Sequence, residues 1–207
     1  MPLKAKRYLD KDADHRAKRV NANSFEGVAD LDIWKQFKTG NESAFIHIYE
    51  LYFEQLFNYG LQFTRDMALV EDCIQDLFIE IRKTRGRLSD TTSIKLYLYK
   101  AIKRKVIQLV KYKRSRFHHE PIDEGYQFHF VFSHEHFLIN QQLDQEQIHK
   151  LNEALKKLPL RQKEVIYYYF YEQLSYAEIK EIMEFVSIKS VRNKAYIALQ
   201  TLRKSYR

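Results

Sequence analysis

The sequence has one cysteine, five glycines and three prolines among its 207 residues. Because Cys73 is alone, an internal disulfide is excluded, and we expect its thiol to be a small core side chain. The scarcity of glycine and proline argues against a fold with many tight turns and favours long helices. There is no signal-peptide pattern and no apolar run of about 20 residues that could span a membrane. We therefore expect a mostly helical protein located in the cytoplasm, with no membrane insertion.

The chain is rich in aromatic residues and positive charge. Fourteen Phe and fifteen Tyr supply bulky core side chains, and the 45% apolar content is enough for one large or two small domains. A formal net charge of +8 and a pI near 9.3 favour a polyanionic partner. Charge alone does not distinguish nucleic acid from an acidic membrane surface.

Hydropathy and charge divide the chain into four segments. Residues 1–28 mix charges without helical periodicity and predict a mobile tail. Residues 29–116 and 147–207 show helical periodicity, whereas 117–146 hold acidic residues but no Lys or Arg. The predicted fold is all-α, with two small helical domains joined by a flexible acidic linker.

Four helices are expected in the first domain and a helix pair at the end of the second. Those of the first domain contain Ile33–Phe37, Phe45–Tyr59, about Leu69–Lys83, and a stretch from a cap at Ser93 towards Lys113. Near the C-terminus, Ser175 and Glu178 form a capping-box pattern, and Ser187 can cap the next helix. The expected buried positions of this pair are Ile179, Ile182, Met183, Val191, Ala195, Ala198 and Leu202.

The last helix carries basic residues on its exposed face, towards its N-terminal end. The candidate DNA-contacting residues are Lys189, Ser190, Arg192, Asn193, Lys194 and Tyr196. This is the layout of a helix-turn-helix, whose second helix enters the major groove. A solvated amphipathic helix is the alternative that this segment alone leaves open.

A second basic block lies in the fourth predicted helix, where nine Lys and Arg residues occur between Lys95 and Arg116 without any acid. Cations interleaved with aromatic rings suit single-stranded nucleic acid. The candidate residues are Tyr97, Tyr99, Lys100, Lys103, Arg104 and Lys111, which flank or oppose a stripe of Ile94, Leu98, Ala101, Ile102 and Leu109. Lys105 falls on the nominally buried side, where it must snorkel or the helix must bend.

The third predicted helix, within "LVEDCIQDLFIEI", combines a buried stripe with a mixed outer face. The stripe is Val70, Ile74, Leu77 and Ile81, which leaves Asp72, Gln75, Asp76 and Ile79 facing outward. An exposed Ile among acids and an amide suggests a protein interface. A plain surface helix with one stray Ile is the alternative.

Three motifs resemble the sigma-70 family of bacterial RNA polymerase sigma factors, in particular the small extracytoplasmic-function group. Residues 158–165, "LPLRQKEV", and 174–179, "LSYAEI", look like the family's fourth conserved region. Residues 72–78, "DCIQDLF", match the second region. The chain departs from the family in the helix-turn-helix turn, which usually carries glycine but here reads "EFVS" and is one residue longer. Arg104 and Gln108 replace a frequent Asn and Asp, so the promoter sequence recognised could differ.

The resemblance implies a role for each candidate surface. Asp72, Gln75, Asp76, Phe78 and Ile79 would dock on the clamp helices of the largest subunit of core RNA polymerase. The fourth helix would melt and read the minus-ten promoter element, with a loop at about Arg85–Thr92 forming part of a base pocket. The last helix would bind the minus-thirty-five element. The implied partners are core RNA polymerase, including its flap, promoter DNA and an anti-sigma factor.

Neither an enzyme nor a metal protein is indicated. The sequence has no Gly-rich phosphate loop or nucleophile elbow, and we expect no cofactor. His118, His119, His129, His134 and His136 cluster without a Cys or a His-Glu-x-x-His helix, so no metal site is expected. A stand-alone helix-turn-helix regulator remains the alternative to a sigma factor, but only the latter explains both domains.

Overall fold

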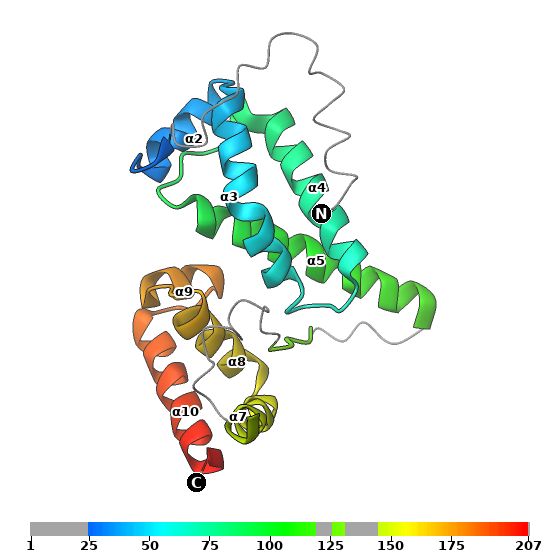
Figure 1. The fold of residues 1–207 in the computed structure, drawn as a ribbon, viewed down its shortest axis with the longest axis vertical. Helices are drawn as coiled ribbons and strands as arrows, with labels where there is room; N and C mark the ends of the chain where they lie inside the picture. The colour runs from blue at the N-terminus through cyan, green and yellow to red at the C-terminus, as the bar shows by residue number, and fades with distance from the viewer. Residues whose placement is uncertain (1–24, 119–125, 131–144, 207) are drawn as a thin grey trace.

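The computed structural model describes residues 25–118, 126–130 and 145–206, and all the regular elements in these parts are helical. Figure 1 shows two groups of helices, one above the other. The N-terminal group contains α2 (Asp30–Lys38), α3 (Glu42–Gly60), α4 (Met67–Thr84), the short 3-10 turn η2 (Arg85–Arg87) and α5 (Ile94–His118). The C-terminal group contains α7 (Gln145–Lys157), α8 (Leu160–Ile166), the π-helical turn η3 (Tyr167–Tyr171), α9 (Tyr176–Ile182) and α10 (Ile188–Tyr206). The predicted all-α, two-domain fold is confirmed.

Side chains before the helices satisfy the backbone N–H groups that a helix start leaves unpaired. Asn41 caps α3 and Asp66 caps α4. At α5 two residues share this task, since the Ser93 hydroxyl accepts a hydrogen bond from Leu96 N–H (3.2 Å) and the distant Asp30 carboxylate accepts one from Ile94 N–H (2.7 Å). The predicted cap at Ser93 is therefore present, and Asp30 ties α2 to the start of α5.

The core of the N-terminal group is aromatic and encloses Trp34, whose indole N–H donates to the Ser89 carbonyl at 2.9 Å. The predicted stripe of α4 is buried, and so is the Cys73 thiol. Leu109, expected in the stripe of α5, is 38% exposed, so the buried stripe does not include it. Phe25 belongs to the segment expected to be a tail, yet it is buried and its ring lies 5.1 Å from that of His47.

In the C-terminal group, α10 packs against α7, α8 and α9. Its expected inner residues Val191, Ala195 and Ala198 are buried, and Leu202 is half-buried. A small second core of Leu155, Leu158, Ile166 and Ala198 joins α7, α8 and α10.

One continuous core runs through both groups. The chain segment 126–130, predicted to be part of the linker, passes between them, and Phe128 is buried with its ring 5.4 Å from Phe63 and 5.3 Å from Tyr167. Within the π-helical turn, the consecutive rings of Tyr167 and Tyr168 are both buried. This part of the predicted linker therefore contributes a buried side chain to the core as well as connecting the two groups.

None of the described helices is long and apolar enough to cross a membrane.

The close packing of α3 on α4 leads to a prediction about Gly60. A Cβ atom at this position would lie 2.5 Å from Cγ1 of the buried, β-branched Val70, which has little freedom to move. We expect Gly60→Ala to destabilise the protein by about 1–3 kcal/mol in urea unfolding, although alanine is the better helix former. The matched control is Gly86→Ala, because a Cβ there meets nothing within 4 Å. Equal stability of the two variants would contradict the packing argument.

Candidate nucleic-acid and protein interfaces

The helix pair α9 and α10 has the geometry of a helix-turn-helix. The predicted capping box is present at the start of α9, where Ser175 and Glu178 each pair with the other's backbone N–H. After α9, Glu184 adopts φ = +55°, the left-handed conformation that glycine usually supplies in such turns. The Ser187 hydroxyl then accepts a hydrogen bond from Ser190 N–H at 3.1 Å, and α10 begins at Ile188. The longer turn is thus accommodated without glycine.

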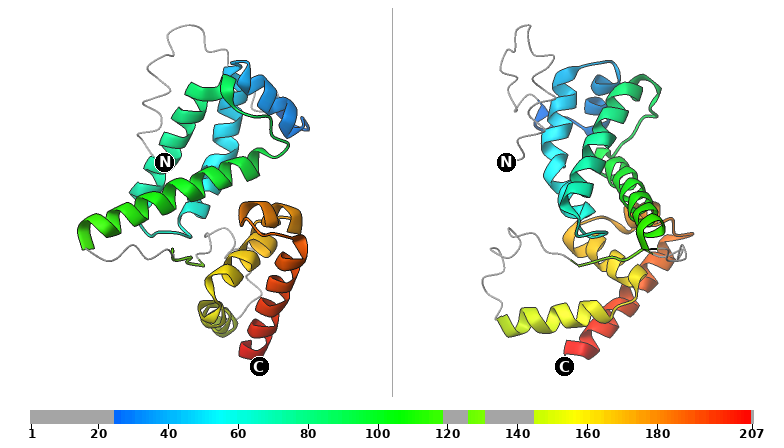
Figure 2. Two further views of the ribbon diagram at one scale, coloured as in Figure 1. Left: turned by 180° about the vertical axis from the view of Figure 1, so that it is seen from behind. Right: turned by 90° about the vertical axis from the view of Figure 1, so that its right-hand side faces the viewer.

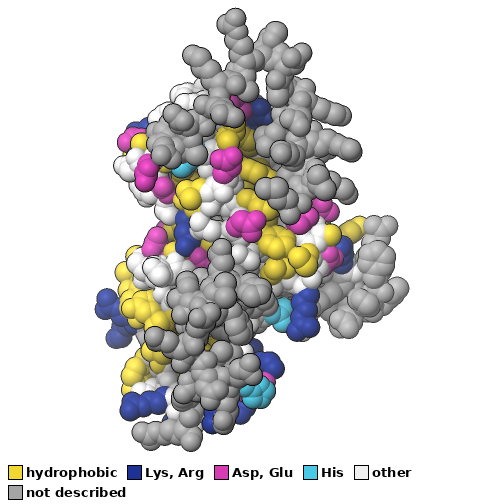
Figure 3. All heavy atoms as spheres, in the orientation of Figure 1, with side chains coloured by type: hydrophobic (Ala, Val, Ile, Leu, Met, Phe, Trp, Pro, Cys, Tyr) yellow, Lys and Arg dark blue, Asp and Glu magenta, His cyan; other side chains and the backbone are white. Residues whose placement is uncertain are grey.

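Most of the candidate residues on α10 are accessible. Lys189, Ser190, Arg192, Asn193 and Tyr196 are exposed, and Lys194 is half-buried. The Arg192 guanidinium lies 5.6 Å from the centre of the Tyr176 ring, and Tyr176 in turn stacks on Tyr169 at 4.8 Å. Figure 3 shows hydrophobic and basic side chains next to each other along the edge formed by α9 and α10. This surface combines cations with planar groups.

The candidate residues on α5 are less accessible than their pattern suggests. Arg104 is exposed, but Lys100 and Lys103 are half-buried. Tyr99, expected at the edge of the basic face, is 1% exposed, and Tyr97 is half-buried against Trp34 at a ring distance of 4.9 Å. As drawn in Figures 1 and 2, α5 crosses the base of the N-terminal group, and α9 contacts it.

Glu164 of α8 is the most buried acid in this contact, with 0% of its surface exposed. One carboxylate oxygen accepts from Lys103 Nζ at 2.7 Å and the other from the Tyr126 hydroxyl at 2.8 Å. The Lys103 ammonium also lies 5.3 Å from the Tyr126 ring and 5.8 Å from the Tyr168 ring. Burial and the negative charge of Glu164 raise the pKa of Tyr126 well above its usual range, so its hydroxyl remains a donor. An ion pair therefore joins α5 to α8 in the interior.

Glu172 forms a second connection at the end of the π-helical turn. Its carboxylate accepts from the Tyr99 hydroxyl at 2.7 Å, from the Tyr167 hydroxyl at 2.7 Å and from Lys95 Nζ at 2.9 Å. Lys95 also donates to the Glu172 carbonyl at 3.0 Å. Nearby, the hydroxyls of Tyr59 and Tyr168 are 2.5 Å apart. These contacts explain why Tyr99 is buried.

The third ion pair, between Lys100 Nζ and a Glu181 oxygen at 2.5 Å, lies at the edge of the contact. Beside it a cleft of about 710 Å³ opens between α5 and the end of α9. Basic residues from both groups line it, namely Lys100, Lys103, Arg104, Lys111 and Arg161. On the opposite flank of α5, Lys105 Nζ pairs with a Glu80 oxygen of α4 at 2.9 Å. Lys105 was expected on the buried side of α5, and its ammonium reaches a partly exposed acid there.

The outer face of α4 is open to solvent. Asp72, Asp76 and Ile79 are exposed, with Ile79 at 41%, and Gln75 is half-buried. Phe78 is 2% exposed, and its ring lies 4.8 Å from that of Tyr49 in a T-shaped contact. Phe78 is therefore placed as a core residue that fixes α4 and not as a surface contact.

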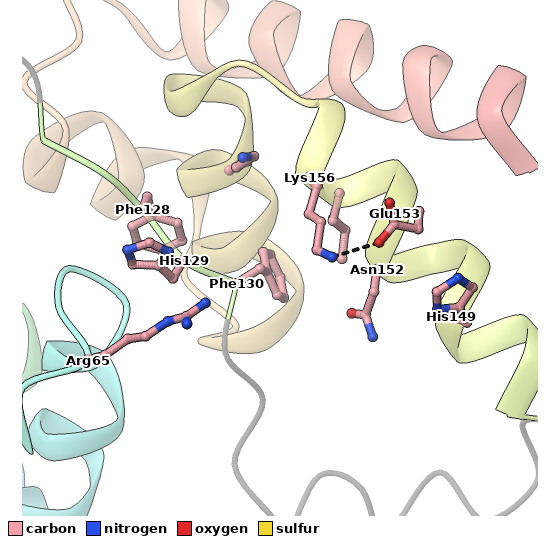
Figure 4. Close-up of a pocket in the computed structure, with 10 residues that line it drawn as sticks. Arg65, Phe128, His129, Phe130, His149, Asn152, Glu153 and Lys156 are labelled. Carbon is pink, nitrogen blue, oxygen red and sulfur yellow. Dashed lines mark hydrogen bonds and ion pairs between the residues drawn. The ribbon is translucent and has the colours of Figure 1, made fainter.

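A smaller cavity of about 380 Å³ lies where the 126–130 segment meets α7 and α8. Figure 4 shows Arg65, His129, Lys156 and Glu153 around it, with Lys156 paired to Glu153. Among the described residues, no group of three or more His, Cys, Asp or Glu side chains could hold a metal ion. His119, His134 and His136 lie outside the described residues, as does the side chain of His118.

Sequence reasoning missed the acids that face α5. From the sequence, Glu164 enters only as part of the motif "LPLRQKEV", and neither Glu172 nor Glu181 is predicted to contact α5. The available signal was the imbalance within 95–116, where nine cations have no acid among them. Such a helix either meets a polyanion or takes its counter-charges from elsewhere in the chain.

Comparisons with known proteins agree with the two helical groups. Residues 48–116 match the family described as Sigma-70 region 2, and residues 154–204 match Sigma-70, region 4. Together the two regions cover more than half of the chain. No curated protein sequence matches it.

Two solved structures have a similar fold. CnrH, in complex with the cytosolic domain of CnrY, is 17% identical with a TM-score of 0.57, over 84% of this chain and 95% of that one. The sigma factor RpoE from Bartonella quintana, in complex with the anti-sigma factor NepR, is 14% identical with a TM-score of 0.56, over 78% and 95%. At these identities the likeness concerns the fold.

Proposed function

Because the chain belongs to the sigma-70 family of RNA polymerase sigma factors, we propose that its exposed helices divide the work of transcription initiation among α4, α5 and α10. The protein is an alternative sigma factor of the extracytoplasmic-function group, which binds core RNA polymerase and directs it to promoters. The observation that carries the proposal is the presence, in one chain, of regions 2 and 4 with an accessible surface on each. The polymerase supplies the catalysis.

The docking surface for core polymerase is the outer face of α4, formed by Asp72, Gln75, Asp76 and Ile79. An exposed apolar side chain surrounded by carboxylates fits a partner surface that offers an apolar contact rimmed by cations. Phe78 acts from the core by holding α4 in place. Part of the polymerase clamp is the expected partner.

The minus-ten element is the expected ligand of α5, through Lys100, Lys103, Arg104 and Lys111. Melting a duplex exposes bases and leaves backbone phosphates that these cations can neutralise. Tyr97 and Tyr99 are the aromatic candidates for base stacking. In the present arrangement Tyr97 is half-buried and Tyr99 is buried. Stacking of a base on either ring would therefore require the side chains that cover it to move.

The minus-thirty-five element is the expected ligand of α10. Lys189, Arg192, Asn193 and Tyr196 are exposed near its start, the part of a recognition helix that reaches base edges. Ser190 and Lys194 flank them. Besides DNA, the C-terminal group is expected to contact the flap of the polymerase.

An anti-sigma factor is a further expected partner. RpoE of Bartonella quintana is bound to an anti-sigma factor, and CnrH to the cytosolic domain of CnrY. The similarity of fold supports the same kind of partner here. We place the protein in the cytoplasm, where polymerase and promoter DNA are found.

Reconstitution with core RNA polymerase tests the proposal directly. The purified chain should co-elute with core polymerase and give run-off transcripts from a promoter selected from a randomised library. A stand-alone regulator would bind DNA without polymerase and yield no transcript from core enzyme alone. That result would reject the sigma-factor function.

The exposed face of α4 gives a first prediction for this function. Asp76→Arg and Ile79→Arg should each reduce capture of core polymerase at least about tenfold, since a reversed or buried charge at an interface costs several kcal/mol. Helicity and urea midpoint should stay unchanged because both side chains are exposed. Glu54→Arg, which reverses an exposed acid on α3, is the matched control. Undiminished capture by both variants would show that the docking surface lies elsewhere.

The recognition helix gives a second prediction. Arg192→Ala should relax base preference at one or two positions of the upstream element, because a bidentate contact to guanine is worth about 1–3 kcal/mol. Arg203 and Lys204 lie roughly 17 Å further along α10 at 1.5 Å per residue, where phosphate contact is expected. Their double change to alanine should weaken binding evenly and flatten its salt dependence.

A saturation library of the upstream element, transcribed with each variant at fixed salt, measures both effects. The outcome that contradicts the assigned orientation of α10 is an unchanged preference for Arg192→Ala or an altered one for the double variant. Tyr176→Phe keeps the ring beneath Arg192 and should preserve the wild-type preference.

A further inference from the structure

We propose that α2 is a brace that holds residues 85–93, the connection between α4 and α5, and so helps to determine which base the protein accepts in the minus-ten element. The positioning residues are Asp30, Trp34 and Lys38. The inference rests on the proposed role of α5 in minus-ten recognition, because this connection leads directly into the start of that helix. All three residues lie before residues 48–116, the part of the chain that matches Sigma-70 region 2.

Little within the connection fixes its own shape. After the 3-10 turn η2, residues 88–93 belong to no helix and half of them are exposed. The hydrogen bonds inside the connection are local, from Leu88 N–H to the Arg85 carbonyl at 3.3 Å and from the Thr91 hydroxyl to the Ser93 carbonyl at 3.0 Å. A segment of this kind adopts one conformation only if neighbouring elements hold it.

The helix α2 supplies three contacts to this part of the chain, with donor–acceptor distances of 2.7, 2.9 and 2.5 Å. The pairs are the Asp30 carboxylate with Ile94 N–H, the Trp34 indole N–H with the Ser89 carbonyl, and Lys38 Nζ with the Asp90 carboxylate. Residues four apart share one face of a helix, so the three side chains form a row along α2. Figures 1 and 2 show the connection passing beside α2 before α5 begins.

The turn between α2 and α3 holds the beginning of the same connection. The Arg85 guanidinium donates to one Glu42 oxygen at 2.7 Å, and Arg82 reaches the other oxygen at 3.0 Å. Arg85 also lies against Gly40, where φ is +99° and an added Cβ would be 3.2 Å from Nη2. Glycine allows both this backbone conformation and the close approach of the guanidinium. The connection is therefore held at its beginning by this turn and along its length by α2.

These contacts fix the backbone of the connection and leave polar side chains open to solvent. Trp34 is buried and binds the connection from the core side, whereas Arg87, Ser89 and Thr92 are exposed. A guanidinium and two hydroxyls can donate to base edges or phosphates. Selection of one base requires such donors to be held to within about 0.5 Å. The brace therefore acts on specificity through the connection and needs no DNA contact of its own.

The contacts of Trp34 and Asp30 should matter most. The pair of Lys38 with Asp90 contributes less, because the Asp90 side chain is 55% exposed and water weakens the attraction. Trp34→Phe keeps an aromatic ring in the core but removes the N–H donor. Asp30→Ala removes the acceptor for Ile94 N–H, whereas Asp30→Asn removes the charge and keeps an acceptor oxygen. These variants separate the hydrogen bonds from packing and from charge.

The measurement is a saturation library of the minus-ten element in the selected promoter, transcribed by the full chain with core polymerase. We expect Trp34→Phe and Asp30→Ala each to relax the preference at one position of this element about fivefold, the lower end of what one base contact contributes. Asp30→Asn should behave like the wild type. The matched control is Ile33→Val, which loosens a buried position of α2 without removing a hydrogen bond. An equal relaxation by Ile33→Val would assign the effect to general loosening and overturn the proposal.

Hydrogen exchange tests the brace independently of transcription. In Trp34→Phe and Asp30→Ala the backbone amides of residues 88–94 should exchange faster than in the wild type, and in Asp30→Asn and Ile33→Val at the wild-type rate. Unchanged exchange would overturn the brace, and faster exchange with an unchanged minus-ten preference would overturn its role in specificity. If the wild-type chain gave no run-off transcript, the proposed function and the role in base selection would both be rejected, whereas the exchange pattern would still show whether α2 holds the connection.

Discussion

The carboxylate of Glu164 determines how the two groups of helices meet. It lies in the interior and needs a donor for each oxygen, because an unpaired buried charge is strongly unfavourable. Lys103 supplies one donor from the N-terminal group and Tyr126 the other from the segment between the groups. One side chain thus specifies the positions of α5, α8 and residues 126–130 together. The aromatic contacts around it supply most of the attraction, and the ion pair supplies the orientation.

Local structure was predictable from the sequence where the residues that determine it lie within one short segment. Ser93, Ser175 and Ser187 each cap a helix as expected, since a cap depends on a hydroxyl and an N–H three residues away. The buried stripe of α4 also follows from its periodicity. Phe78 shows the limit of this reasoning, because a motif position implied a partner contact while the packing of α3 placed the ring in the core.

The arrangement of the groups was not predictable, because its causes are distant in sequence. Lys103 and Glu164 are 61 residues apart, and Tyr59 and Tyr168 are 109 apart. Periodicity correctly placed Lys100 and Lys103 away from the stripe of α5, but it could not say what faces them. The same limit applies to Phe128, whose acidic surroundings in the sequence suggested a tether, and whose ring packs between Phe63 and Tyr167 within one continuous core. Only the excess of cations in α5 indicated that negatively charged partners outside this helix were needed.

The chemistry that suits α5 to nucleic acid also makes it able to bind its own chain. An ammonium group donates to a carboxylate or to a phosphate with similar geometry. An aromatic ring packs equally well against a tyrosine ring or a nucleic-acid base. A helix with nine cations and no acid would repel itself in isolation, so covering it with Glu164, Glu172 and Glu181 relieves that repulsion while the chain is alone. The recognition helix differs, because Lys189, Arg192 and Asn193 remain exposed in the same arrangement. The structure therefore leaves the basic start of α10 open to solvent while acids of the C-terminal group cover part of the basic face of α5.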